Sequence, residues 1–168
     1  MTSPHPGFGL RVVASGTTDL VLTRTFAAPA PLLFSALTQP ELLRRWYGAR
    51  GWQLTVCEVD PRPGGAWRFV STGPGGAEME THGLYREFVP PARVVQTEIH
   101  RDWADGAALV TTVLDETDGS TAMTVTAQYS SSEIRDAVLR SPMERGAGEG
   151  YDRLAAVLDT LINERRES

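Results

Sequence analysis

The side chains with the clearest chemical potential are acidic and imidazole groups that alternate along two predicted strands. Glu78, Glu80 and His82 share one face of the first strand. Glu98 and His100 repeat the pattern on the next strand. On a cavity wall such groups act as an acid/base pair or as part of a metal site, whereas on the other face they form a solvated stripe. If the protein were an enzyme, His82 would be the candidate acid/base group.

Motifs of the common catalytic centres are missing from the sequence. The three histidines lack HExxH or comparable metal-binding spacing, and no Gly-x-Ser-x-Gly, phosphate-loop or dinucleotide fingerprint occurs. Cys57 is the only cysteine, which excludes an intramolecular disulfide and a cysteine zinc cluster. Its place in a strand predicts a small buried hydrophobe. We therefore expect no metal, no cofactor and no catalytic residue, and a binding protein rather than an enzyme.

A set of aromatic and flexible apolar residues is typical of a ligand cavity. Large rings with a polar handle suit a flat, partly polar ligand. For any single residue the alternative is plain core packing. The residues predicted to bind ligand are Trp46, Trp67, Phe69, His82, Tyr85, Trp103, Met123, Tyr129, Met143, Ala147, Gly150 and Tyr151.

Three glycines fall in the first two turns of the predicted C-terminal helix. Gly146, Gly148 and Gly150 each cost a helix about 0.5–1 kcal/mol relative to alanine. Missing side chains leave space, so we place the ligand beside this part of the helix, near Met143. The alternative is close backbone packing against the sheet, or a kink.

One sheet and a few helices must position these residues. A strand over 20–26 precedes two short helices, and the pair ends at Trp46-Tyr47-Gly48. Gly- and Pro-rich turns separate six further strand-like runs, which indicates an antiparallel meander. Two Ser-initiated capping boxes open a short helix and then a long amphipathic helix over about 142–164, with Pro142 at its first position. The six runs are 52–59, 66–72, 78–88, 93–100, 107–115 and 120–129.

This order predicts the α+β class, with a curved seven-stranded antiparallel sheet, two short helices and a long C-terminal helix enclosing a cavity. The 168 residues fit one domain, which we place at 18–168. Residues 1–17, rich in Pro, Gly, Ser and Thr, predict a flexible N-terminal arm.

The overall charge and hydropathy exclude some classes of binding partner. The net charge of -5 argues against a nucleic acid and against an anionic membrane surface. The sequence has no run of eighteen apolar residues and no secretory signal at its start. We therefore expect a cytoplasmic protein.

Five segments in chain order resemble the SRPBCC (START/Bet v 1-like) superfamily, in the branch related to the C-terminal domain of the heat-shock chaperone ATPase activator. The resemblance covers about residues 20–163. The segments are 24–29 (RTFAAP), 40–48 (PELLRRWYG), 62–67 (RPGGAW), 82–87 (HGLYRE) and 143–154, which begins MERG and ends YDRL.

The resemblance implies a helix-grip fold whose deep cavity binds lipids, polyketides or other hydrophobic molecules. The tail over 143–154 also resembles that of CalC-like enediyne self-resistance proteins, which bind a reactive enediyne and are cut by it. We expect a hydrophobic small molecule as the partner, and a monomer or weak homodimer. Two alternatives stay open: a polyketide cyclase or aromatase that uses His82, and an accessory that binds a chaperone through its surface.

Overall fold

In the computed structural model, which describes residues 9–167, eight strands form one sheet and the helices cover one of its faces. A short 3-10 turn, η1 (Pro74–Gly76), caps one hairpin. The elements in chain order are β1 (Arg11–Ser15), β2 (Asp19–Phe26), α1 (Ala30–Thr38), α2 (Pro40–Trp46), β3 (Gln53–Val59), β4 (Ala66–Thr72), β5 (Glu78–Val89), β6 (Arg93–His100), β7 (Trp103–Thr117), β8 (Ser120–Gln128), α3 (Ser132–Arg140) and α4 (Met143–Glu167).

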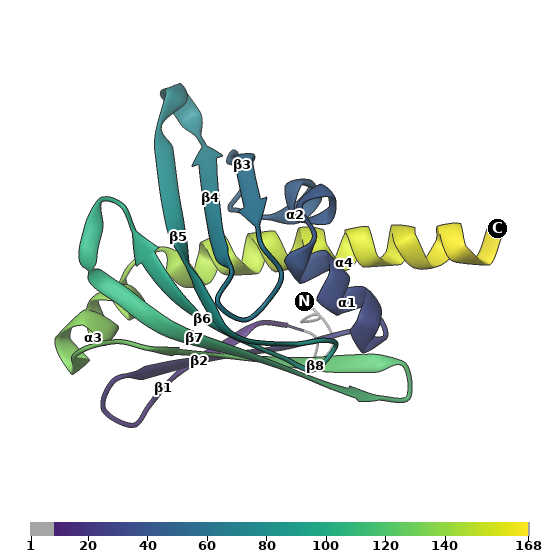
Figure 1. The fold of residues 1–168 in the computed structure, drawn as a ribbon, viewed down its shortest axis with the longest axis horizontal. Helices are drawn as coiled ribbons and strands as arrows, with labels where there is room; N and C mark the ends of the chain where they lie inside the picture. The colour runs from purple at the N-terminus through teal and green to yellow at the C-terminus, as the bar shows by residue number, and fades with distance from the viewer. Residues whose placement is uncertain (1–8, 168) are drawn as a thin grey trace, which may run out of the picture.

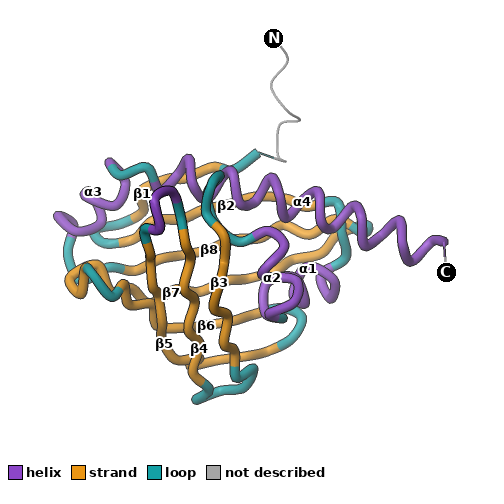
Figure 2. Tube along the Cα trace, turned by 90° about the horizontal axis from the view of Figure 1, so that it is seen from above, coloured by secondary structure: helices purple, strands orange, loops and turns teal. Residues whose placement is uncertain are grey.

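The strand order is β1-β2-β8-β7-β6-β5-β4-β3, and every neighbouring pair is antiparallel. After β2 the chain crosses through α1 and α2 to the far edge, and the meander from β3 to β8 then returns to pair with β2. The sheet bends so that β3, β4 and β5 stand up beside α4 (Figure 1). Seen from above, α4 crosses the sheet and its C-terminal end projects beyond it (Figure 2). The predicted α+β helix-grip architecture is thus confirmed.

The sheet has one strand more than the seven predicted, and the extra strand lies inside the predicted arm. Residues 11–15 form β1, which pairs with β2 from Arg11 opposite Thr23 to Ser15 opposite Asp19. Four of its five residues are exposed, so the segment shows no hydrophobic alternation from which a strand can be predicted. Residues 1–8 of the predicted arm lie outside the described residues.

A buried charge ties this first hairpin to α3. Arg135 is only 8% exposed. Its guanidinium donates to the carbonyl oxygens of Asp19 at 2.8 Å and of Ser15 and Gly16 at 3.4 Å each, and it pairs with Asp136 at 2.8 Å. A buried guanidinium is tolerated when its donors are satisfied in this way. The hairpin is therefore fixed to the body of the domain.

The C-terminal half of α4 packs as ordinary core, as its apolar stripe predicts. Leu154, Val157 and Leu158 are buried in the same cluster as Phe26 of β2 and Leu33 of α1. Burial of each large aliphatic side chain contributes roughly 1.5–3 kcal/mol. Helix α4 is therefore anchored at this end by apolar contact.

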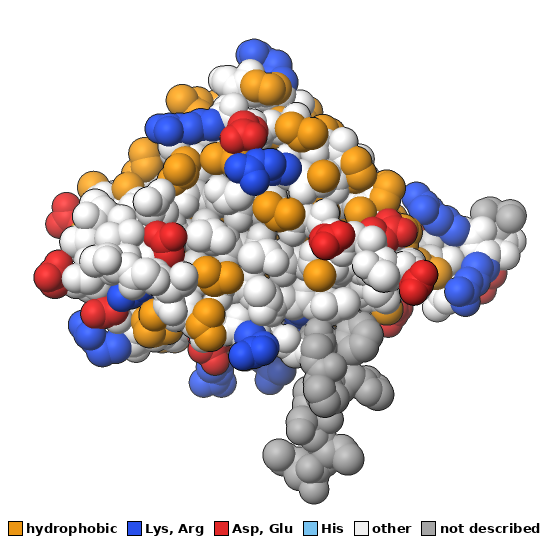
Figure 3. All heavy atoms as spheres, turned by 90° about the horizontal axis from the view of Figure 1, so that it is seen from below, with side chains coloured by type: hydrophobic (Ala, Val, Ile, Leu, Met, Phe, Trp, Pro, Cys, Tyr) orange, Lys and Arg blue, Asp and Glu red, His pale blue; other side chains and the backbone are white. Residues whose placement is uncertain are grey.

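The face seen from below is of mixed character (Figure 3). Hydrophobic, acidic and basic side chains are interspersed on it, without a large area of one kind. Within residues 9–167, no helix combines the length and the apolar character that a bilayer crossing requires.

Gly83 of β5 allows the backbone of β6 to pack closely against it, and this contact predicts how a substitution changes the stability of the fold. The indole Nε1 of Trp67 donates to the carbonyl oxygen of Thr97 at 3.1 Å, and a Cβ added at Gly83 would overlap that same oxygen. We expect Gly83→Ala to lower the free energy of unfolding by about 1–3 kcal/mol, because the β6 backbone cannot shift without disturbing the sheet. Urea denaturation followed by circular dichroism measures the change.

Gly148→Ala is the control for this substitution. Among the neighbours of Gly148 within residues 9–167, only the Leu10 side chain, at 3.9 Å, lies within 4 Å of a Cβ added there. Since alanine favours a helix over glycine, Gly148→Ala is expected to raise the stability by about 0.5–1 kcal/mol. A Gly83→Ala protein as stable as the wild type would contradict the prediction.

Candidate ligand-binding cavity

A cavity of about 680 Å³ lies between the sheet and the N-terminal half of α4. Strands β2 and β4 to β8, both short helices and the loop after α2 contribute to its walls. From α4 itself the lining residues are mostly small or flexible, namely Met143, Gly146, Ala147 and Gly150, with Tyr151 next to the core. Sites for small molecules occupy roughly 300–1,000 Å³, so this volume suits one ligand.

The structure brings eleven of the twelve predicted site residues together around this cavity. Two residues of its lining, Met79 and Trp103, are 46% and 40% exposed, which places them at the mouth. Direct contact of the lining residues with a ligand stays a prediction. The eleven are Trp46, Trp67, Phe69, Tyr85, Trp103, Met123, Tyr129, Met143, Ala147, Gly150 and Tyr151.

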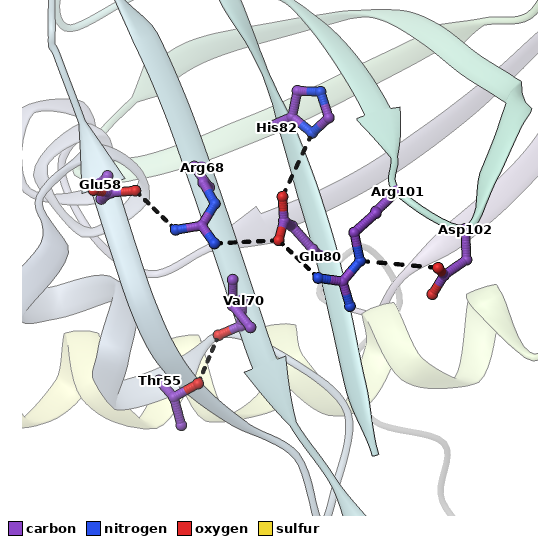
Figure 4. A network of polar contacts seen from close by, with 8 residues as sticks. All are labelled: Thr55, Glu58, Arg68, Val70, Glu80, His82, Arg101 and Asp102. Atoms are coloured by element: carbon purple, nitrogen blue, oxygen red, sulfur yellow. Dashed lines mark hydrogen bonds and ion pairs between the residues drawn. The ribbon is translucent and has the colours of Figure 1, made fainter. Parts of the chain in front are cut away.

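His82 is the exception, and its predicted role in the cavity is wrong. The cavity-lining residue is its neighbour Thr81, so His82 points from the opposite face of β5. There Glu80 accepts hydrogen bonds from Arg68 at 3.2 Å and from Arg101 at 3.1 Å, and its other carboxylate oxygen lies 4.0 Å from Nδ1 of His82 (Figure 4). The group is the solvated charged stripe that the sequence left as the alternative.

Pairing between β5 and β6 decides which imidazole faces inward. Thr81 lies opposite His100. Directly opposed residues of antiparallel strands share a face, so His100 points into the cavity with Thr81 and His82 points away. The sequence shows the alternation on both strands but not this register. The alternation alone therefore does not distinguish His82 from His100 as the inward histidine.

The glycines of α4 only partly leave space for a ligand. A Cβ at Gly150 would lie 3.2 Å from the carbonyl oxygen of Gly48, and one at Gly146 would lie 3.5 Å from Cβ of Ala49. Close packing therefore explains Gly150, which also lines the cavity. Gly148 is not among the lining residues, so the expected free space is confined to the side of Gly146 and Gly150.

Two polar contacts hold the loop after α2 against α4 at this point. The Arg153 guanidinium donates to the carbonyl oxygens of Gly48 and Ala49. The backbone N–H of Arg50 donates to Oε1 of Glu149 at 3.1 Å. The loop forms part of the cavity wall, so these contacts set the wall's position.

Five rings make a continuous aromatic wall. The centroids of Trp67 and Phe69 are 4.9 Å apart, and Tyr47 follows at 5.0 Å from Phe69. Trp46 lies 5.7 Å from Tyr47 and 5.9 Å from Tyr151. The indole N–H groups of both tryptophans are bonded to backbone carbonyls, so they present apolar surface rather than free donors. Such a wall suits a flat apolar ligand.

Strand β6 supplies a row of inward residues, mostly polar, that are missing from the twelve predicted ligand-binding residues. Val94, Gln96, Glu98 and His100 all line the cavity. Nε2 of His100 lies 3.3 Å from Oε1 of Glu98, and their side chains are 34% and 32% exposed. The alternation of Gln96, Glu98 and His100 is visible in the sequence. Only the register shows that it faces inward.

Three tyrosines lie in the electrostatic field of this carboxylate. Burial, followed by the negative charge of Glu98, raises the pKa of Tyr129 and of Tyr151 to about 12. The same two causes raise the pKa of Tyr47 even further. All three phenols therefore stay protonated at neutral pH and remain hydrogen-bond donors.

Cys57 is free and buried, as expected for a small apolar residue. Burial raises the pKa of its thiol to about 11. The reactive form of cysteine is the thiolate, which is scarce at neutral pH when the pKa is so high. Cys57 therefore contributes packing and no nucleophile.

A curved antiparallel sheet that encloses a cavity under a long C-terminal helix defines a helix-grip protein of the SRPBCC type. Comparison with known proteins agrees. Residues 27–159 match the family model described as Activator of Hsp90 ATPase homolog 1-like protein. The chain belongs to this family. No curated protein matches it.

Two solved structures document the similarity. A protein from Rhodobacter sphaeroides is 35% identical with a TM-score of 0.86, over 90% of this chain and 99% of that one. A protein from Nitrosomonas europaea is 27% identical with a TM-score of 0.79, over 87% and 97%. Their descriptions name no ligand, so these comparisons support the family and the fold.

The pair on β6 generates a pH prediction. A hydrogen bond to Glu98 raises the pKa of His100 above its ordinary value. We expect the imidazole pKa of His100, measured by NMR titration, to fall in Glu98→Gln. Since the folded state binds this proton more tightly than the unfolded state, the pair stabilises the fold below the unfolded pKa of about 6.5 and loses this effect as the pH rises through the folded pKa.

The same pair predicts how stability depends on pH. The stability advantage of wild type over Glu98→Gln is expected to be larger at about pH 5.5 than at about pH 8.5. Glu78→Gln, an exposed position on neighbouring β5, is the control and should show no such difference. An equal advantage at both pH values would contradict the pairing of Glu98 with His100.

Proposed function

We propose that this protein binds one hydrophobic small molecule in the cavity under α4, and that it carries or sequesters this molecule rather than converting it. The observation that carries the proposal is the cavity of about 680 Å³ with its wall of five rings. Burial of apolar ligand surface there would provide about 25 cal/mol per Å². Membership of a family whose fold commonly encloses hydrophobic ligands supports it.

We further propose a polyketide-like natural product as the ligand, in preference to a lipid. Rings in edge-to-face and tilted contact favour a flat, rigid molecule over a flexible chain, which loses more conformational entropy on binding. Enediyne sequestration and self-resistance would be one instance. It is supported by the resemblance of residues 143–154, five of which line the cavity.

The other two functions have less support. The cyclase alternative loses its chosen acid/base group because His82 lies on the outer face of β5. The chaperone-accessory alternative rests on the family description alone. Neither alternative accounts for the aromatic wall as directly as ligand binding does.

A matched pair of substitutions on β7 tests the cavity. Thr112 lines the cavity, and the preceding residue, Thr111, points from the other face of the strand. We expect the neutral fluorescent probe N-phenyl-1-naphthylamine to bind the wild type, and Thr112→Phe to weaken binding about tenfold or more because the new ring occupies ligand space. Fluorescence titration gives both dissociation constants.

Thr111→Phe adds the same ring to the same strand and should leave the affinity within about twofold. Circular dichroism checks that both variants are folded. If the probe fails to bind the wild type, or binds all three proteins equally, the cavity is not its site and the proposed function is wrong.

A further inference from the structure

The cavity has a polarity gradient along β6. At one end Val94 lies among buried apolar residues such as Tyr85 and Leu114. Toward the β6–β7 hairpin the inward side chains become Gln96, Glu98 and then His100 beside the mouth. A ligand that fills the cavity therefore meets apolar surface along most of its body and a carboxylate near the opening.

The carboxylate of Glu98 has free hydrogen-bonding capacity. One oxygen, Oε1, lies 3.3 Å from His100, and within residues 9–167 no hydrogen bond is made by Oε2. Glu98 is only about one-third exposed, as its side-chain accessibility of 32% shows. An ionised carboxylate accepts hydrogen bonds and does not donate them. A ligand beside it therefore gains most from an O–H or N–H donor.

The charge balance of the lining points the same way. Among the described residues that line the cavity, Glu98 is the one carboxylate and no arginine occurs, while the sequence contains no lysine. Of the arginines near the cavity, Arg24 pairs with Asp152 at 2.7 Å, although its buried Nε has no hydrogen-bond partner within residues 9–167, and Arg153 donates to backbone carbonyls. A ligand carboxylate or phosphate would therefore enter beside a negative charge, with His100 as the one titratable cation in the lining.

We propose that Glu98, oriented by His100, is the polar recognition point of the cavity: it accepts a hydrogen bond from a hydroxyl or amine of an otherwise apolar, uncharged or cationic ligand, and it disfavours anionic ligands. The inference rests on the proposed function and narrows it. Flat phenolic molecules fit both ends of the cavity, whereas fatty acids and other carboxylates do not.

Three probes of one scaffold test this inference. Naphthalene, 2-naphthol and 2-naphthoate are titrated at about pH 7.5 as competitors of N-phenyl-1-naphthylamine. A purely apolar cavity would favour naphthalene, because burying an unpaired hydroxyl costs free energy. With Glu98 as acceptor, we expect 2-naphthol to bind about tenfold more tightly than naphthalene, as a hydrogen bond to a charged group implies. We expect 2-naphthoate to bind at least about tenfold more weakly than 2-naphthol.

Two substitutions of Glu98 test whether its carboxylate causes these differences in affinity. Glu98→Gln keeps the shape and removes the charge, and should reduce the preference for 2-naphthol over naphthalene to below about threefold. Glu98→Met removes the acceptor as well, and should make naphthalene the tighter ligand. In both variants the disadvantage of 2-naphthoate should shrink. Glu78→Gln, exposed on β5, is the charge control and should retain every wild-type ratio.

The outcomes separate the two proposals. If naphthalene binds and the ratios are the same in wild type and both Glu98 variants, the recognition point is wrong and the hydrophobic cavity stands. If 2-naphthoate binds the wild type as tightly as 2-naphthol, the rejection of anions is wrong. If none of the three compounds displaces the fluorescent probe, the cavity does not take apolar ligands and both proposals fail.

Discussion

Helix α4 is held over the sheet in two different ways along its length, and the cavity exists because of this difference. Its C-terminal half is buried against α1, α2 and β2 through residues such as Leu154 and Leu158. Its N-terminal half packs through Met143 and Ala147 against the small apolar cluster of Leu20, Leu22 and Val138, and polar contacts hold its edges, from Arg153 to the loop after α2 and from Arg24 to Asp152. Polar contacts at the edges fix the helix without filling the space beneath it. The sheet and helix can therefore enclose a volume without collapsing onto each other.

The position of the loop after α2 follows from the same contacts. Gly150 lets the Gly48 backbone approach α4, and the carbonyl oxygens of this loop accept hydrogen bonds from the Arg153 guanidinium. The loop then carries Tyr47 into the aromatic wall, where it contacts Phe69. A glycine in the middle of a helix, costly by itself, thus serves the construction of the site.

The chemistry of the cavity depends on which face of two neighbouring strands turns inward. Opposition of Thr81 and His100 places Glu98 and His100 inside, and Glu80 and His82 in the ion-pair network outside. The two pairs are alike in composition but opposite in role. Outside, Oε1 of Glu80 accepts hydrogen bonds from both Arg68 and Arg101 on the sheet surface. Inside, Oε2 of Glu98 makes no hydrogen bond within residues 9–167, and this is the oxygen assigned to the proposed ligand.

The sequence by itself determined the elements of this protein. Local periodicity, turn residues and helix caps predict seven of the strands, helices α1 and α2, and the capped helices α3 and α4. These signals act over a few residues, so they can be recognised in the sequence. The aromatic and Met residues around the cavity could be predicted too, because large apolar residues are easily recognised in the sequence. Strand β1 could not be predicted, since its five residues are held by backbone pairing to β2 and by the hairpin's contacts with Arg135, which leave no pattern in side-chain type.

Only the tertiary structure decided which residues meet. An alternation of period two shows that Glu78, Glu80 and His82 share a face, but a shift of one residue in strand pairing exchanges the inner face for the outer. Pairing between β5 and β6 places Glu98 and His100 on the inner face, and Glu80 and His82 on the outer face. Neither strand alone contains this information. The closeness of Gly150 to Gly48 likewise joins residues that are about a hundred positions apart, so no local pattern could reveal it.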